Sequence, residues 1–221
     1  MFTTTISFRI LLLAGLFIVF SSTSLFANRQ RGMLLEAEKR LAALGYWVTK
    51  ADGRADASTR HAVMAFQKIE GLKRTGVLTR PVLEKIKNAS TPIARHGGPA
   101  HIEIDISRQV LLMVNDEGAV TLVVPVSTGN GERYYAKDRA EWDIARTPRG
   151  KYKIFNKFNG TRKAPLGDLF YPSYFLAGWA VHGSNSVPAK PASHGCVRVP
   201  RGADQMLFKI MPKGMPIYLY D

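Results

Sequence analysis

The most reactive side chain in the sequence is Cys196, the only cysteine of the chain. It directly follows His194-Gly195, Arg198 stands two residues after it, and His182 stands 14 residues before it. A thiol is mostly protonated at neutral pH, and a nearby imidazole or guanidinium group lowers its pKa and favours the nucleophilic thiolate. These residue types and spacings predict a cysteine nucleophile served by a histidine base.

The neighbours of Cys196 suit the other needs of acyl transfer. Gly195 leaves room for a substrate carbonyl, and the N–H groups of Gly195 and Cys196 are expected to point together at an oxyanion. Arg198 offers a planar guanidinium group that fits a carboxylate. No Asp or Asn stands nearby in sequence to orient a histidine base, so the carbonyl group of Gly183 is the expected substitute.

Two other interpretations of the same residues stay open. Cys196 could be a plain buried thiol, because unpaired cysteines often behave as small apolar residues. His182, His194 and Cys196 could instead be the three protein ligands of a catalytic zinc ion. The zinc hypothesis leaves Ser193 and Gly195 without a purpose, so we prefer the nucleophile and expect no metal or other cofactor.

The elements that must position these residues change character along the chain. Residues 33–89 show apolar side chains at helical spacing in three short segments, the first two of which end at Gly45 and Gly71. Within residues 100–221, the stretch 101–106 alternates apolar and polar side chains, as a half-buried strand does, and 110–114 and 120–126 read as further strands. Only 203–210 reads as a helix. We therefore expect a small three-helix N-terminal module and a mainly-β sandwich or barrel. Residues 90–99, rich in Pro, Gly, Ser and Thr, are the expected linker.

Residues 1–27 have the pattern of a secretory signal peptide. Arg9 precedes an apolar run at 10–20, and Ser and Thr residues lead from there to Ala27. The run is shorter than the roughly 20 residues that span a membrane, so we expect membrane contact only through this segment. An exported protein with one cysteine has no internal disulfide, which favours a free reactive thiol. We expect export to the periplasm or cell wall.

The charge of the chain favours anionic partners. The formal net charge is +14; residues 28–99 carry 14 Lys and Arg against 6 Asp and Glu, and residues 100–221 carry 16 against 11. Such a surface suits wall polymers, anionic headgroups or the carboxylates of peptide stems. Nucleic acid is not an expected partner, because the chain has neither a recognition-helix signature nor an aromatic-rich sheet motif.

The string Ser193-His194-Gly195-Cys196-Val197-Arg198, preceded by His182-Gly183, resembles the signature of L,D-transpeptidases with the YkuD-type catalytic domain. Residues 104–111, 125–129 and 147–150 match further strings of that family in the same order, so the resemblance covers about residues 101–220. Two features depart from the family pattern. The spacing from His182 to Cys196 is short, and the segment 130–146 is long enough for a lid or rim loop. Residues 41–78 resemble the common peptidoglycan-binding repeat.

The resemblance implies a reaction and a role for each residue. Cys196 would attack the bond between the diamino acid and the next D-residue of a stem tetrapeptide in peptidoglycan, and an amine acceptor would resolve the thioester. His182 would be the base and then the acid, oriented by the Gly183 carbonyl, and His194 would shape the pocket. The remaining implied contacts are an oxyanion hole from Gly195 and Cys196, and substrate binding by Arg198 and Ser193.

Alternatives to this reaction also stay open. Water in place of the amine would give an L,D-carboxypeptidase. Another family of wall cysteine peptidases places its Cys before its His, whereas here both histidines precede Cys196. A non-catalytic wall-binding protein would suit the helical module but would leave His182, His194 and Cys196 idle. The resemblance also implies carbapenem-type inhibitors as partners, because a strained lactam presents the same carbonyl to the nucleophile.

Overall fold

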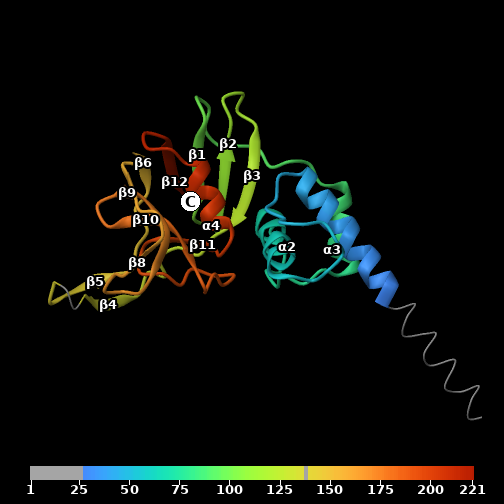
Figure 1. Ribbon diagram of the computed structural model, residues 1–221, viewed down its shortest axis with the longest axis horizontal. Helices are drawn as coiled ribbons and strands as arrows, with labels where there is room; N and C mark the ends of the chain where they lie inside the picture. Colours follow the sequence, from blue (N-terminus) through green and yellow to red (C-terminus); the bar gives the residue numbers. More distant parts are fainter. Residues whose placement is uncertain (1–26, 137–138) are drawn as a thin grey trace, which may run out of the picture.

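The computed structural model describes residues 27–136 and 139–221 of the 221-residue chain. All but the last residue of the expected signal peptide at 1–27 lie outside the described residues. Figure 1 shows helices at one end of the molecule and a larger body of strands at the other. None of the helices in the described part of the chain is long and apolar enough to cross a membrane.

Three helices form the N-terminal module, as expected. The first covers residues 27–43, and it is followed by α2 (Ala57–Ile69) and α3 (Arg80–Asn88). The Asp56 side chain accepts a hydrogen bond from the Thr59 N–H and starts α2, and the Thr79 side chain caps α3 in the same way. These caps satisfy amides that have no partner within the helix.

The larger body contains two five-stranded sheets and a hairpin, so the expected mainly-β domain is confirmed. The first sheet has the order β3-β2-β1-β12-β6, and the second has the order β11-β10-β9-β7 with β8 paired to β9. The strands of the first sheet are β1 (His101–Asp105), β2 (Val110–Val114), β3 (Val120–Pro125), β6 (Gly150–Lys153) and β12 (Pro216–Tyr220). Those of the second are β7 (Asn156–Lys157), β8 (Thr161–Arg162), β9 (Leu169–Leu176), β10 (Trp179–Ser184) and β11 (Val197–Pro200).

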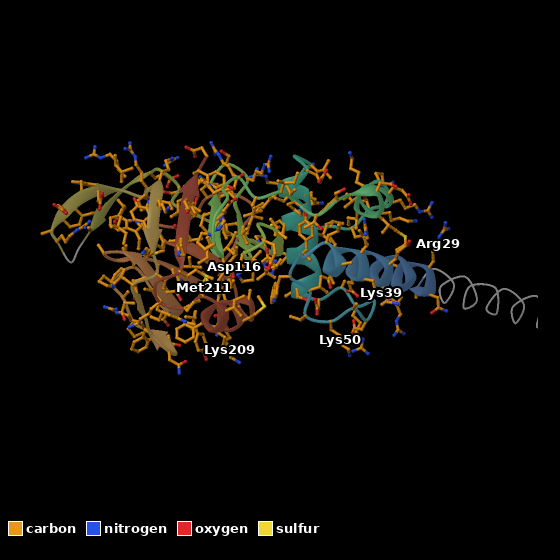
Figure 2. All side chains as sticks on the ribbon, turned by 90° about the horizontal axis from the view of Figure 1, so that it is seen from above. Arg29, Lys39, Lys50, Asp116, Lys209 and Met211 are labelled. Carbon is orange, nitrogen blue, oxygen red and sulfur yellow. The ribbon has the colours of Figure 1, made fainter. Side chains whose placement is uncertain are left out.

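The remaining elements are a hairpin and one helix. The hairpin consists of β4 (Arg133–Ala136) and β5 (Glu141–Ile144), and it projects at the end of the molecule opposite the helical module (Figure 1). Helix α4 (Ala203–Ile210) forms where the sequence predicts it. Its buried Leu207 and the following Met211 pack into a core that both sheets line. Figure 2 shows Met211 within this body of side chains.

The helical module and the first sheet share one apolar core. Phe66 of α2 belongs to the same buried cluster as Val110, Leu112 and Val123 of the sheet. Every residue of β1 and β2 is buried. Alternate side chains of both strands pack into the core that the two sheets line, whereas the helices cover the opposite face of β2 and the 90–99 segment covers that of β1. The expectation of a half-buried strand at 101–106 is therefore wrong for β1.

The segment 90–99 is attached to the first sheet. The carboxylate of Glu103 is fully buried and accepts hydrogen bonds from the backbone N–H groups of Arg95 and His96, at 3.0 and 2.6 Å. The Tyr220 hydroxyl donates to the same carboxylate at 2.7 Å. Residues 90–99 have the composition of a flexible linker, but the hydrogen bonds to Glu103 fix their path along the sheet.

A buried lysine joins the module to the turn that leads to β2. The Nζ atom of Lys68, on α2, donates to the carbonyl oxygens of Gln109 and Val126 at 3.1 and 2.8 Å. Gln109 has a φ of 63°, a left-handed conformation that a non-glycine residue adopts only when its surroundings hold it there. Burial and the charge of Arg74 lower the pKa of Lys68 to about 7.

We expect Lys68 to make folding stability depend on pH. Its pKa is lowered in the folded state, so between about pH 7 and 10.5 the unfolded chain binds a proton that the folded chain does not. The free energy of unfolding should therefore rise with pH in this window, by up to about 1.4 kcal/mol per pH unit. Urea denaturation of the wild type and of Lys68→Met at pH 6, 7, 8 and 9 measures this slope. An identical slope in both proteins would contradict the assignment.

Candidate active site

Cys196 directly precedes β11 and lines a pocket of about 760 Å³. Strand β11 runs parallel to β10, with Val197 opposite Val181. The Cys196 side chain is partly exposed, and its Sγ atom lies 3.6 Å from the carbonyl oxygen of Gly178. His182, from β10, lines the same pocket, so two strands of one sheet bring together the two residues that the sequence predicts as nucleophile and base.

His182 is buried, and one of its ring nitrogens already has a partner. Its Nδ1 atom lies 2.8 Å from the carbonyl oxygen of Gly183. A carbonyl oxygen only accepts, so Nδ1 carries the proton and Nε2 of the neutral ring is left as a proton acceptor. Burial lowers the pKa of His182 to about 4, and Arg198 adds to this effect while the Gly183 carbonyl opposes it. The ring is therefore neutral at physiological pH.

The Cys196 thiol is also neutral in the resting protein. Burial raises the pKa of Cys196, although a backbone hydrogen bond from Ala180 and the charge of Arg198 act in the opposite direction. The sequence-based expectation that the neighbouring cations lower this pKa is wrong on balance, because burial outweighs them. This geometry suits a mechanism in which the imidazole takes the thiol proton as sulfur attacks, rather than a preformed ion pair.

Ser193 and Gly195 shape the loop before Cys196. The Ser193 Oγ atom donates to the Cys196 carbonyl oxygen at 2.6 Å and accepts from the Gly195 N–H at 3.0 Å. The Gly195 N–H is therefore occupied, which corrects the expectation that it joins Cys196 in an oxyanion hole and leaves the Cys196 N–H as the candidate donor. Because Ser193 Oγ bonds twice within the loop, it holds the loop, whereas the sequence analysis assigned it to substrate binding.

A second correction concerns why Gly195 is a glycine. Its φ is 138°, and a Cβ atom here would lie 2.6 Å from Trp179 Nε1 and 2.8 Å from the Arg146 carbonyl oxygen. A side chain at Gly195 would thus displace the loop from its own protein surroundings. Gly183 is constrained similarly, because an added Cβ would overlap the Asp204 carboxylate of α4. Sequence reasoning missed Asp204, which lies 22 residues after His182.

Backbone hydrogen bonds tie the Cys196 loop to the segment that follows β3. Ser127 and Arg198 exchange two backbone bonds of 3.0 Å. The Thr128 carbonyl oxygen accepts from Ala192 and Ser193, both at 2.9 Å. Thr128 is in turn held by the side chain of Gln109, the residue that Lys68 supports. A continuous series of contacts therefore runs from the helical module to the loop.

Thr147 provides a further support from the segment before β6. Its Oγ1 atom donates to the carbonyl oxygen of Gly195 at 2.7 Å and accepts from the Gly129 N–H at 2.8 Å. Thr147 is buried. The strings 125–129 and 147–150, noted in the sequence for their family resemblance, thus contact the loop that carries Cys196.

His194 and Arg198 both line the pocket. His194 is exposed, and its ring packs edge-on against Tyr134 of β4, with 4.7 Å between ring centroids. Burial and the charge of Arg198 lower the pKa of His194. Arg198 is half-buried and lies opposite His182 in the β10–β11 register. The long 130–146 segment contains the β4–β5 hairpin, which supplies one wall of the pocket.

The sequence analysis missed several other residues that line the pocket. They come from strands or loops well before the Cys196 loop, and they include Tyr134, Arg139, Arg162, Tyr174 and Trp179. The only feature of the sequence that could have indicated these lining residues is the high aromatic content of β9, the strand before the one that carries His182. As for the zinc hypothesis, the described ranges contain no group of three or more His, Cys, Asp or Glu side chains placed to hold a metal ion.

Comparison with family models gives two matches. The model described as the L,D-transpeptidase catalytic domain (YkuD) matches residues 99–219, more than half of the chain. A model for a peptidoglycan-binding domain matches residues 30–86. A search of curated proteins finds no significant match.

Solved structures include close relatives. The chain is 41% identical to the L,D-transpeptidase from Xylanimonas cellulosilytica DSM 15894, with a TM-score of 0.80 over 85% of this chain and 92% of that one. It is 23% identical to the L,D-transpeptidase (Yku) from Stackebrandtia nassauensis, with a TM-score of 0.50 over 85% of this chain and 90% of that one. At this lower identity the similarity concerns the fold alone.

Proposed function

Because the chain belongs to the L,D-transpeptidase family, with a YkuD-type catalytic domain and an N-terminal peptidoglycan-binding domain, we propose that it is a cysteine acyltransferase acting on peptidoglycan stems. One observation carries the proposal. Cys196 and His182 line one pocket, and the Gly183 carbonyl fixes the tautomer of His182 that leaves Nε2 free to accept a proton.

In the first half-reaction, Cys196 Sγ attacks the carbonyl carbon between the diamino acid and the following D-residue. His182 Nε2 takes the thiol proton, and the Cys196 N–H donates to the developing oxyanion. The tetrahedral intermediate then collapses: the C–N bond breaks, the leaving amine takes the proton from His182, and a thioester remains on Cys196.

In the second half-reaction, an amine acceptor attacks the thioester. His182 removes the proton of the attacking amine, and the C–S bond breaks. The departing sulfur takes that proton, which restores the neutral thiol and imidazole. The product is a new amide bond that cross-links or modifies the wall. Water in place of the amine would make the enzyme an L,D-carboxypeptidase.

Incubation of the protein with purified disaccharide tetrapeptide tests this reaction. Transpeptidation gives a dimer that lacks one D-residue, and mass spectrometry identifies it. A disaccharide tripeptide as the sole product would assign the carboxypeptidase reaction. Unchanged substrate would support the remaining alternative, a wall-binding protein without catalysis.

We further propose a division of the chain that suits work in the wall. Residues 1–27 would direct export, 33–89 would bind peptidoglycan, 90–99 would connect the units, and 100–221 would carry catalysis. The enzyme would then act in the periplasm or cell wall. Arg29, Lys39 and Lys50 are exposed on the helical end of the molecule, as Figure 2 shows, and provide positive charge for an anionic polymer.

We expect the full-length Cys196→Ala protein to sediment with insoluble peptidoglycan at low salt and to be released as salt rises, because exposed charges are screened. Lys39→Glu with Lys50→Glu should raise the fraction in the supernatant. Lys209→Glu with Lys213→Glu, on the other unit, is the matched control and should leave sedimentation unchanged. Equal effects of the two double variants would contradict the assignment of wall binding to the module.

Replacing Thr147 with valine should slow the reaction without unfolding the protein. Valine has the shape of threonine but leaves the Gly195 carbonyl oxygen and the Gly129 N–H unpaired. A lost buried hydrogen bond of about 1–3 kcal/mol, felt at the Cys196 loop, predicts a decrease in kcat/KM of about 5- to 100-fold. Thr147→Ser keeps the hydroxyl and should stay near wild type. Steady-state kinetics with circular dichroism as the folding control measures this; a wild-type rate for Thr147→Val would contradict it.

A further inference from the structure

The pocket contains a buried hydroxyl group without a partner. Tyr174, on β9, is 5% exposed and lines the pocket, and its Oη atom has no hydrogen-bond partner among the described residues. Leaving a buried polar group unpaired is unfavourable, and such groups are rare in folded proteins. In a pocket that also contains Cys196 and His182, the simplest partner for this hydroxyl is a group of the substrate.

The sheet register places Tyr174 beside the reacting atoms. Tyr174 lies opposite Ala180 of β10, Val181 lies opposite Val197 of β11, and Cys196 directly precedes Val197. Residues that neighbour each other across strands share one face of a sheet. Neighbouring strands are roughly 4.8 Å apart, and Tyr174 and Cys196 both line the pocket.

Arg162 supplies a positive charge next to this hydroxyl. Its guanidinium carbon lies 5.3 Å from the centre of the Tyr174 ring, and it lines the same pocket. No ion pair joins Arg162 to a carboxylate in the described part of the chain, whereas Arg139 on the hairpin pairs with Glu141 and Asp143. Burial and the neighbouring Cys196 raise the pKa of Tyr174, although the charge of Arg162 and its side-chain interaction with the hydroxyl oppose this. The hydroxyl keeps its proton, which is available for donation to a ligand.

We propose that Arg162 and Tyr174 form a carboxylate-binding subsite for the D-residue that leaves in the first half-reaction, an inference that rests on the proposed function. The guanidinium group and the phenolic O–H are two donors suited to one carboxylate. The carboxylate carbon of a terminal D-residue lies within about 4 Å of the attacked carbonyl carbon, because three bonds of standard length separate them. The other carboxylates of a stem lie farther along the chain. The subsite therefore selects a stem that ends directly after the D-residue, and rejects one that continues.

Matched donor peptides test the subsite. One is a tetrapeptide with a free terminal carboxylate, and the other is the same peptide with a terminal carboxamide. We expect the wild type to prefer the acid by about 10- to 100-fold in kcat/KM, since hydrogen bonds to a charged group are the stronger ones. Arg162→Gln and Tyr174→Phe should bring this ratio toward one by slowing the reaction of the acid only. Lys163→Gln, a neighbouring charge that pairs with Asp168, is the control and should keep the ratio.

The outcomes separate the subsite from the proposed function. Turnover of the acid by the wild type, with an acid-to-amide ratio that both variants retain, overturns the subsite and leaves the function standing. A third donor, amidated on the diamino acid rather than at the terminus, tests whether Arg162 binds the carboxylate of the diamino acid instead. If Arg162→Gln changes only the preference between this donor and the unmodified acid, the assignment to the leaving residue is wrong. A wild type that converts none of the donors overturns the proposed function and the subsite with it.

Discussion

Replacing Cys196 with alanine is expected to abolish turnover, with a loss of about four orders of magnitude or more, the scale seen when a covalent nucleophile is removed. The fold should remain, because Cys196 is partly exposed and its sulfur makes only backbone contacts, with the Gly178 carbonyl oxygen and with Ala180. Thermal denaturation should therefore give a melting temperature close to that of the wild type. The reaction with disaccharide tetrapeptide, followed by mass spectrometry, measures the loss.

The same variant identifies the atom that reacts with carbapenems. A strained lactam presents its carbonyl to the sulfur, and ring opening replaces departure of the D-residue. Intact-protein mass spectrometry should show one carbapenem added to the wild type and none added to Cys196→Ala. An adduct on the alanine variant would mean that another residue is acylated, and comparable turnover by that variant would end the cysteine mechanism.

Replacing His182 with asparagine should remove the base while keeping its anchor. The asparagine side-chain N–H₂ stands where Nδ1 stands and can still donate to the Gly183 carbonyl oxygen, but nothing replaces Nε2. Loss of a general base predicts a decrease in kcat of about 10²- to 10⁴-fold. His182→Ala also loses the hydrogen bond to the Gly183 carbonyl oxygen. The difference between the two variants therefore measures what that hydrogen bond contributes, apart from the loss of the base.

We expect the reaction rates of the wild type and of His182→Asn to depend differently on pH. The pKa of His182 is lowered to about 4, so the imidazole stays a base down to mildly acidic pH, and the wild-type rate should fall only as pH approaches 4. In His182→Asn that acidic limb should be absent. The rate should instead rise with pH as the thiol itself ionises, because burial raises the pKa of Cys196. A wild-type rate that halves near pH 6.5, the ordinary pKa of histidine, would contradict this account.

The sequence predicted best those site residues that lie close to one another along the chain. Cys196, His182 and the Gly183 carbonyl could be grouped because only 13 residues separate His182 from Cys196 along the chain. The same local reasoning misjudged Gly195. Gly195 lies against Trp179 and Arg146, and the residues around Cys196 in the sequence do not predict these contacts.

The rest of the site depends on sheet register and burial, which a single sequence does not reveal. Thr147 and Tyr174 reach the pocket region from separate strands and loops, so their roles follow only once the strands are paired. The direction of the Cys196 pKa shift has a similar origin. The sequence shows the cations that lower it, whereas the burial that outweighs them is a property of the whole fold.

The core shared by the helical module and the first sheet also limits where the enzyme can work. Two units joined by a flexible chain search a volume set by the length of that chain. Here Phe66 and Val123 lie in one buried cluster, Lys68 bonds across the junction, and Glu103 holds the connecting segment, so the units have one relative orientation. A molecule bound to a glycan strand through its helical module would hold the pocket at one distance and one angle from that strand. Only stems at that spacing would be substrates, and lengthening residues 90–99 would not extend its range.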